Sequence, residues 1–271
     1  MQNISILLFT FLLVSNAFGR FQSLDLNRKM GNVNQSSQMA VGLKSKFGKV
    51  FSKHFDGKKL GVLIEWGNLR PNAYASFDDE GAPYVLLTEG MINHRMMNQD
   101  SVNLVICHEL GHFLAGSPKK NRGRSQKKSW SSAEGQADYF ATAYCMKALL
   151  SFESTPQKFA SEGISKDINS DIDYLCGGTL RCKRIVEAAY RLARVYADSK
   201  FYPVSLSLVQ RSDNVVSETL LSHPEPQCRL DTMVAGALCP YSLEMDFNKN
   251  TQLECDKSIH SRPPCWFARG N

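Results

Sequence analysis

The chain has 271 residues, of which 43% are hydrophobic, and a formal net charge of +6. This length allows one large globular domain or two small ones, each with a sizeable core. The charge is only mildly positive and no nucleic-acid-binding motif accompanies it, so we expect no nucleic acid partner.

The first 19 residues have the pattern of a secretory signal peptide. They contain no charged residue, residues 4–14 form an apolar core, and Ala17-Phe18-Gly19 offers a cleavage site. We expect residues 1–19 to be removed, so that the mature chain begins near Arg20. A retained N-terminal anchor is the alternative. No later segment stays apolar over enough residues to span a membrane.

Eight cysteines in an exported chain favour disulfides. Three pairs of sequence neighbours are the candidates for local bridges: Cys176/Cys182, Cys228/Cys239 and Cys255/Cys265. Cys107 and Cys145 lie in predicted buried helices, either as a fourth bridge or as two unreactive thiols. We expect residues 20–271 to form a single domain with a cysteine-rich extension from about residue 240.

Apolar residues at helical spacing predict an amphipathic helix over residues 37–55. Three short runs rich in β-forming residues follow at 60–66, 72–77 and 83–87, with a turn signal at Asp78-Asp79-Glu80-Gly81. These runs predict a small antiparallel sheet. Its exposed edge can bind an extended peptide by main-chain hydrogen bonds, or the sheet can simply cover the core.

The next element is an apolar helix between Ser101, which suits an N-cap, and Gly116, which suits the position after the C-terminus. Apolar residues surround its axis, which predicts a buried helix. It contains His108-Glu109-Leu110-Gly111-His112, the pattern H-E-x-x-H. Because residues four apart share a helix face, both histidines can bind one metal ion, and Glu109 at the rim can deprotonate the attacking water. The alternative is a chance match with two hydrogen-bonded core histidines.

A basic stretch follows this helix. Residues 117–128 hold six basic residues and no acidic one. They form either a solvated loop or a loop that steers substrates toward the site. Ser131-Ser132-Ala133-Glu134 then has the pattern of a capping box that opens a helix to about Leu150. Beyond it we expect mixed structure at 151–182, a helix at 185–196, loop and short helix at 199–222, and a helix at 228–238.

A catalytic zinc ion usually takes three protein ligands, so two histidines leave one position to fill. Glu134 is the best candidate for the third ligand. Asp138 lies four residues later on the same helix face, where it can accept the outer N–H of a ligating histidine and fix its tautomer. The alternative is that Glu134 only caps its helix.

Five motifs occur in a fixed order: Asn72-Ala73-Tyr74, the strand before Thr88-Glu89-Gly90, the H-E-x-x-H stretch, Glu134-Gly135-Gln136-Ala137-Asp138, and His223-Pro224 followed by Arg229. Together they resemble the catalytic core of the HtpX-like and CAAX-prenyl-protease family of zinc metallopeptidases, over roughly residues 36–240. The resemblance implies an α+β, mainly helical zincin-like domain that binds one Zn²⁺ and has a small antiparallel sheet before the active-site helix.

The resemblance also implies roles for individual residues. Glu134 becomes the third zinc ligand. His223 meets the developing oxyanion or sits over the zinc in a resting state, unless it is only a turn residue before Pro224. Arg229 is expected to be a buried ion-pair partner. Asn72, Ala73 and Tyr74 are expected to contact the polypeptide substrate.

We therefore expect a periplasmic or secreted zinc endopeptidase that acts on exported or misfolded proteins. The best-known members of the family are integral membrane enzymes, whereas this chain resembles the soluble branch, with peripheral association with a membrane or with outer-membrane proteins as an option. Two rivals remain: a non-catalytic, chaperone-like binding module and a hydrolase of non-peptide bonds. The intact Glu109 argues against the first rival, and the predicted edge strand argues against the second.

Overall fold

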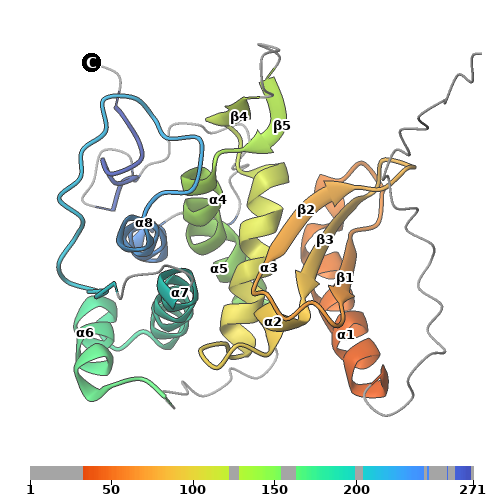
Figure 1. The fold of residues 1–271 in the computed structure, drawn as a ribbon, viewed down its shortest axis with the longest axis horizontal. Coiled ribbons are helices and arrows are strands. Elements are labelled where there is room, and N and C mark those ends of the chain that lie inside the picture. The colour runs from red at the N-terminus through yellow and green to blue at the C-terminus, as the bar shows by residue number, and fades with distance from the viewer. Residues whose placement is uncertain are drawn as a thin grey trace, which may run out of the picture.

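The computed structural model describes residues 33–121, 128–153, 163–198, 204–240, 243, 255 and 260–269. The predicted signal peptide and residues 122–127 of the basic stretch lie outside these residues. The fold is mainly helical with two small sheets, as expected for an α+β protein (Figure 1). Its helices are α1 (Val33–Phe51), α2 (Glu89–Ile92), α3 (Gln99–Leu114), α4 (Glu134–Phe140), α5 (Met146–Ser151), α6 (Lys166–Cys176), α7 (Leu180–Asp198) and α8 (Pro226–Leu238).

The larger sheet contains β1 (Gly61–Glu65), β2 (Ala73–Phe77) and β3 (Pro83–Thr88) in the order β1-β3-β2. β2 and β3 form the predicted antiparallel hairpin, but β1 runs parallel to β3, so the prediction of a purely antiparallel sheet was wrong. The burial of the strands explains this order. β3 is mostly buried and takes the centre, whereas β1 and β2 keep exposed positions and form the two edges.

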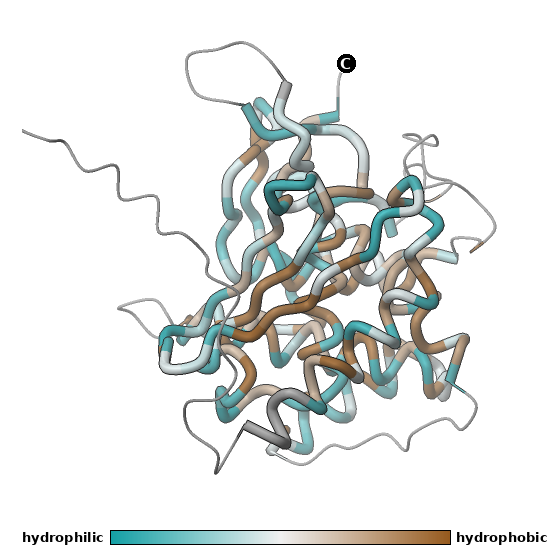
Figure 2. Tube along the Cα trace, turned by 90° about the vertical axis from the view of Figure 1, so that its right-hand side faces the viewer, coloured by the Kyte–Doolittle hydropathy of each residue, from teal (hydrophilic) through white to brown (hydrophobic). Residues whose placement is uncertain are grey.

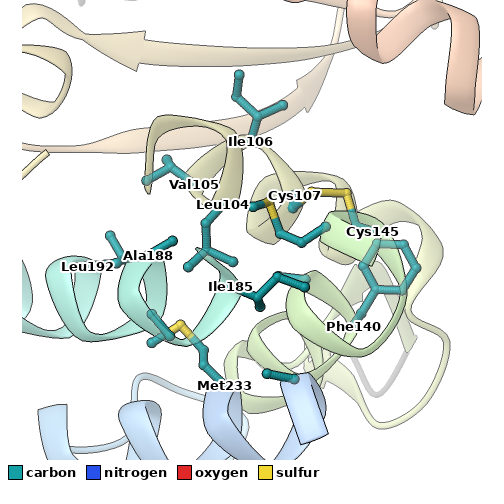
Figure 3. Packing of buried hydrophobic residues seen from close by; sticks show 14 of the residues in the cluster. Leu104, Val105, Ile106, Cys107, Phe140, Cys145, Ile185, Ala188, Leu192 and Met233 are labelled. Atoms are coloured by element: carbon teal, nitrogen blue, oxygen red, sulfur yellow. A yellow bond between two sulfur atoms is a disulfide. The ribbon is translucent and has the colours of Figure 1, made fainter. Parts of the chain in front are cut away.

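Helix α3 lies in the middle of the molecule, between the larger sheet on one side and α4 and α7 on the other (Figure 1). Its N-cap is Asn98, three residues before the predicted Ser101, and these two residues form a reciprocal capping box. Gly116 follows the helix with a φ of 74°, a conformation that favours glycine. Leu104 points toward α7 and Ile106 points toward the sheet, so α3 is apolar on opposite faces (Figure 3).

The helix predicted to end near Leu150 is continuous through α4, a π-helical turn at Ala141–Cys145 and α5. The predicted capping box at its start is wrong. Ser132 belongs to a strand, Ala133 is the N-cap without a side-chain hydrogen bond, and Glu134 is the first helical residue. The backbone of α4 runs against α3, because a Cβ built on Gly111 would lie 2.8 Å from the Cα of Ala137. Glu134 is therefore free of a capping role and enters the space beside α3.

The remaining elements surround this centre. The basic stretch begins a short hairpin of β4 (Lys119–Asn121) and β5 (Lys128–Ser132), which stands over the C-terminal end of α3 (Figure 1). The segment predicted to be mixed contains α6, and residues 204–222 contain no helix. Hydrophobic segments run through the interior, and the turns at the periphery are hydrophilic (Figure 2). Within the described ranges, no helix combines the length and apolar character needed to cross a membrane.

All eight cysteines form disulfides: Cys107–Cys145, Cys176–Cys182, Cys228–Cys265 and Cys239–Cys255. The predicted Cys176/Cys182 pair is confirmed, and Cys107 and Cys145 form a bridge (Figure 3). The predicted Cys228/Cys239 and Cys255/Cys265 pairs are wrong. Cys228 lies in the first turn of α8 and Cys239 follows its last, so they are roughly 16 Å apart at about 1.5 Å per residue. This distance is far beyond the reach of a disulfide.

Candidate metal centre

Three buried side chains from two helices meet at one point. His108 and His112 lie one turn apart on α3, with ring centroids 4.9 Å from each other. Glu134 enters from the first residue of α4. One candidate ligand atom from each residue lies within 4.8 Å of the other two. The H-E-x-x-H spacing thus produces the common face that the sequence predicted.

The hydrogen bonds of the two histidines direct one nitrogen of each ring toward this point. His108 Nδ1 lies 2.7 Å from Asp138 Oδ1, and His112 Nδ1 lies 2.9 Å from the carbonyl oxygen of Ser132. Both acceptors require a proton on Nδ1. The Nε2 lone pairs are therefore the ones available for an ion, which is the arrangement found around metal-bound histidines.

The third donor fits a cation equally well. Glu134 Oε2 is buried and lies 3.2 Å from His108 Nε2 and 3.3 Å from His223 Nε2, with no other hydrogen-bond partner among the described residues. A buried carboxylate oxygen is costly unless a positive charge or a donor satisfies it. A divalent ion between Glu134 and the two Nε2 atoms would remove this cost.

The electrostatics of the cluster are consistent with a cation site. Burial lowers the pKa of His108, but the Asp138 and Glu134 carboxylates together outweigh burial and raise it to about 9. The surroundings of His108 thus favour a positive charge at this position. Burial lowers the pKa of His112 to about 3, so this ring stays neutral and keeps a lone pair for a metal.

Asp138 is held in place by Arg229 from α8. The guanidinium donates two hydrogen bonds to the carboxylate, from Nε at 2.7 Å and from Nη2 at 2.8 Å. It also lies over the ring of Tyr196, with Cζ 3.8 Å from the centroid. Burial raises the pKa of Asp138, but Arg229 and His108 together outweigh burial and lower the pKa to about 2. Asp138 therefore stays ionised and fixes the orientation of His108.

Glu109 lies beside the cluster but is not one of its three donors. Its carboxylate is buried, and its Oε2 lies 4.0 Å from His112 Nε2. Burial raises its pKa to about 7. A carboxylate that titrates near neutral pH can both accept and return a proton.

The structure also brings His223 to the cluster, from the loop before α8. Its side chain is 68% exposed, while its Nε2 lies 3.3 Å from Glu134 Oε2. Partial desolvation of the ring on its inner side lowers its pKa, which favours the neutral form.

Sequence reasoning did not single out Lys120. Its ammonium group forms an ion pair with Glu134 Oε1 from the β4–β5 hairpin. The basic composition of residues 117–128 indicated that a cation could lie near the site. The sequence did not distinguish among its six basic residues, and only the pairing of β4 with β5 shows that Lys120 is the one that contacts Glu134.

Asn72 precedes β2, and Ala73 and Tyr74 are its first two residues; β2 packs against α3, the helix of the two histidines. β2 pairs with β3 on one side, and no strand among the described residues pairs with its other edge. The backbone amide of Thr88 donates to the carbonyl of Asn72 at 3.0 Å. Because hydrogen-bonding directions alternate along a strand, the backbone groups of Ala73 and Ala75 face the open edge.

Two histidines of an H-E-x-x-H helix and a glutamate from a second helix form a ligand set that is typical of zinc metalloproteases. Residues 62–235 match the profile of peptidase family M48, and the chain belongs to this family. The family resemblance of the five motifs is thus confirmed, and the chain is a metalloendopeptidase of a zinc-dependent family. Comparisons with curated proteins and with solved structures gave no match.

Proposed function

We propose that this chain is a zinc endopeptidase of an exported compartment, which binds an extended polypeptide and hydrolyses it with Glu109 as the general base. The observation that carries the proposal is the convergence of two Nε2 lone pairs and the Glu134 carboxylate within 4.8 Å, directly beside the separate carboxylate of Glu109.

His108, His112 and Glu134 would hold one Zn²⁺. When bound, the ion would polarise the scissile carbonyl and lower the pKa of the attacking water. Asp138 and Arg229 contribute by fixing the tautomer and the direction of His108, because a ligand held in one orientation loses little freedom when the metal binds.

Glu109 performs the proton transfers. It accepts a proton from the attacking water and later donates it to the amine that leaves. Its burial supports both steps, since a pKa of about 7 places the acid and base forms within reach near neutral pH.

His223 would act on the developing oxyanion. A neutral imidazole with one N–H can donate a hydrogen bond to that oxygen, and His223 Nε2 lies 3.3 Å from the proposed ligand Glu134. The alternative is that His223 covers the metal in a resting state. Its exposure and loop position suit both roles, because a loop residue can move as a substrate enters.

The substrate would bind as an added strand along β2. The carbonyl of Ala73 and the main-chain groups of Ala75 offer hydrogen bonds to an extended peptide irrespective of its sequence, while the amide of Ala73 donates to Asn72 Oδ1 at 2.9 Å. Asn72 Nδ2 donates to the Tyr74 hydroxyl at 2.6 Å, which fixes both side chains at this edge. This mode suits unfolded or extended chains as substrates.

The four disulfides support a location outside the cytoplasm, because the reducing conditions of the cytoplasm keep thiols free. Together with the signal-like residues 1–19, they favour a periplasmic or secreted enzyme and exported substrates.

The proposal is tested with purified oxidised protein, by metal analysis and by cleavage of a panel of denatured proteins with and without chelator. We expect about one zinc per chain and chelator-sensitive cleavage that added zinc restores. Binding of unfolded proteins without cleavage would instead indicate the chaperone-like module. Hydrolysis of small esters without cleavage of any protein would indicate a non-peptide hydrolase.

A further inference from the structure

The segment Ser261–Arg269 near the C-terminus, called here the tail segment, lies beyond the stretch that matches the family profile, residues 62–235. It nevertheless lies against α4 and α8, the two elements that flank the metal cluster (Figure 1). The contacts that matter for the cluster come from Trp266, Cys265, Pro264 and Arg262.

The first contact is with α4, directly after the proposed ligand Glu134. Trp266 is fully buried, and its ring lies so close to the backbone of Gly135 that an added Cβ would be 2.2 Å from ring carbon Cδ2. Only glycine fits between this ring and the helix. The position of the Trp266 ring therefore sets how the first turn of α4 lies, and with it the carboxylate of Glu134.

The second contact is with the loop that carries His223. The amide of Leu220 donates to the carbonyl of Trp266 at 2.8 Å, and the amide of Val216 donates to the carbonyl of Pro264 at 2.9 Å. Cys265 is bonded to Cys228 in the first turn of α8. The tail segment thus holds the chain at Leu220 before His223 and at Cys228 after it, although His223 itself is exposed.

A third contact extends this support to α3. Arg262 Nη1 donates to Gln136 Oε1 at 3.0 Å, and Gln136 Nε2 donates to the carbonyl of Ala115 at 2.8 Å. Ala115 is the C-cap of the helix that carries both histidines. The contacts of the tail segment therefore reach α3, α4 and the loop before α8. The two helices supply the three candidate ligands, and the loop supplies His223.

We infer that the tail segment is a positioning element of the active site, in which Trp266 aligns Glu134 through Gly135 and the Cys228–Cys265 disulfide holds the His223 loop against the metal ligands. This inference rests on the proposed function, since it assigns the tail to the same site. It adds Gly135, Trp266, Cys228 and Cys265 as positioning residues that touch neither substrate nor metal.

The test measures zinc affinity by competition with a chelator, and kcat and KM on a denatured protein, well below the melting temperature. Gly135→Ala should displace the Trp266 ring and lower the zinc affinity by about tenfold or more, as the loss of groups that orient a metal ligand does. Trp266→Leu should have a similar effect. The double variant should recover part of the loss, because the smaller side chain makes room for the new methyl group.

The disulfide is tested separately with the double variant Cys228→Ser/Cys265→Ser. We expect kcat to fall at least severalfold with a smaller change in KM. The matched control is Cys176→Ser/Cys182→Ser, whose bond joins α6 to the first turn of α7, where no proposed ligand lies. It should lower the melting temperature but keep the zinc affinity and kcat of the parent.

A purely structural tail would lower the melting temperature in every variant and leave zinc affinity and kcat as in the parent, which would overturn the inference alone. A parent that neither binds zinc nor cleaves would overturn the proposed function, and this inference with it. If the disulfide variant does not fold, the Gly135/Trp266 pair decides, since it keeps all four disulfides.

Discussion

The two halves of the proposed active site are built differently. The metal-binding half consists of helix residues that are almost completely buried, with His108, His112, Glu134, Asp138 and Arg229 at 6% exposure or less. The substrate-facing half comes from an edge strand, a hairpin and a loop, and its side chains are exposed, such as Tyr74 at 49% and His223 at 68%. Rigid helices suit a site that must hold an ion in one geometry, whereas exposed loops and edges suit partners that vary.

The largest effect should follow from removing a ligand in the buried half. Glu134→Ala should weaken zinc binding strongly, abolish cleavage at limiting zinc and lower the melting temperature. The metal stabilises the native state by about 2.7 kcal/mol at a free concentration of 100 times its Kd, and this contribution would be lost. Zinc analysis and melting curves test the expectation, with Glu80→Ala, an exposed carboxylate in a turn, as the matched control. If the variant binds zinc like the parent, the third ligand lies elsewhere, and His223 is the next candidate.

The next effect separates chemistry from metal binding within the same half. Glu109→Gln keeps the size and hydrogen bonding of the side chain but cannot accept a proton. We expect zinc to stay near one per chain and kcat to fall by roughly a hundredfold or more. Loss of zinc in parallel with activity would show that Glu109 is a ligand and not the base.

The substrate-facing half is tested by His223→Ala. Loss of one oxyanion donor costs on the order of a hundredfold in kcat, whereas zinc affinity should stay within a few-fold of the parent. Steady-state kinetics and chelator competition give both values. An increase in activity would instead favour the resting-state role, in which His223 covers the metal.

A smaller effect is expected when the hydrogen bond between His108 and Asp138 is weakened. Asp138→Asn keeps the shape of the side chain but removes the charge that pairs with Arg229 and orients His108. Zinc affinity should fall by about tenfold, and stability should fall too, because Arg229 loses its buried partner. Unchanged zinc affinity would show that the tautomer of His108 does not depend on Asp138.

The smallest effect concerns the basic hairpin. If it steers substrates, Lys127→Gln/Lys128→Gln should slow cleavage of acidic substrates a few-fold more than basic ones, and less so at high salt. Lys120 is left intact in this test because it contacts Glu134. Equal effects on both substrate classes would leave only a solvated hairpin.

Sequence patterns that depend on local chemistry predicted the structure well. The H-E-x-x-H helix and the positions of the three strands follow from spacing and turn signals within about twenty residues. The identity of the metal-site candidates His108, His112 and Glu134 required only the helical period and the family motifs.

Features that depend on distant parts of the chain were not predictable in this way. The direction of β1 depends on which strand is buried in the centre, and that is known only once α3 packs beneath the sheet. Cys228 pairs with Cys265 and not with Cys239 because a helix separates the sequence neighbours. The contact of Lys120 with Glu134 depends on the hairpin register. Each of these is decided by three-dimensional packing and not by residue type.

The Cys107–Cys145 disulfide has a consequence for how the ion is captured. Cys107 precedes His108 on α3, and Cys145 ends the π-helical turn that continues the helix of Glu134. The bond closes a loop over a separation of 38 residues, which in the chain-entropy treatment stabilises the folded state by about 4 kcal/mol. The helices that carry the donors are thus joined covalently whether or not metal is present. An incoming ion therefore meets two helices that are already joined, and part of the entropy of collecting its donors is lost at oxidation, before the ion binds.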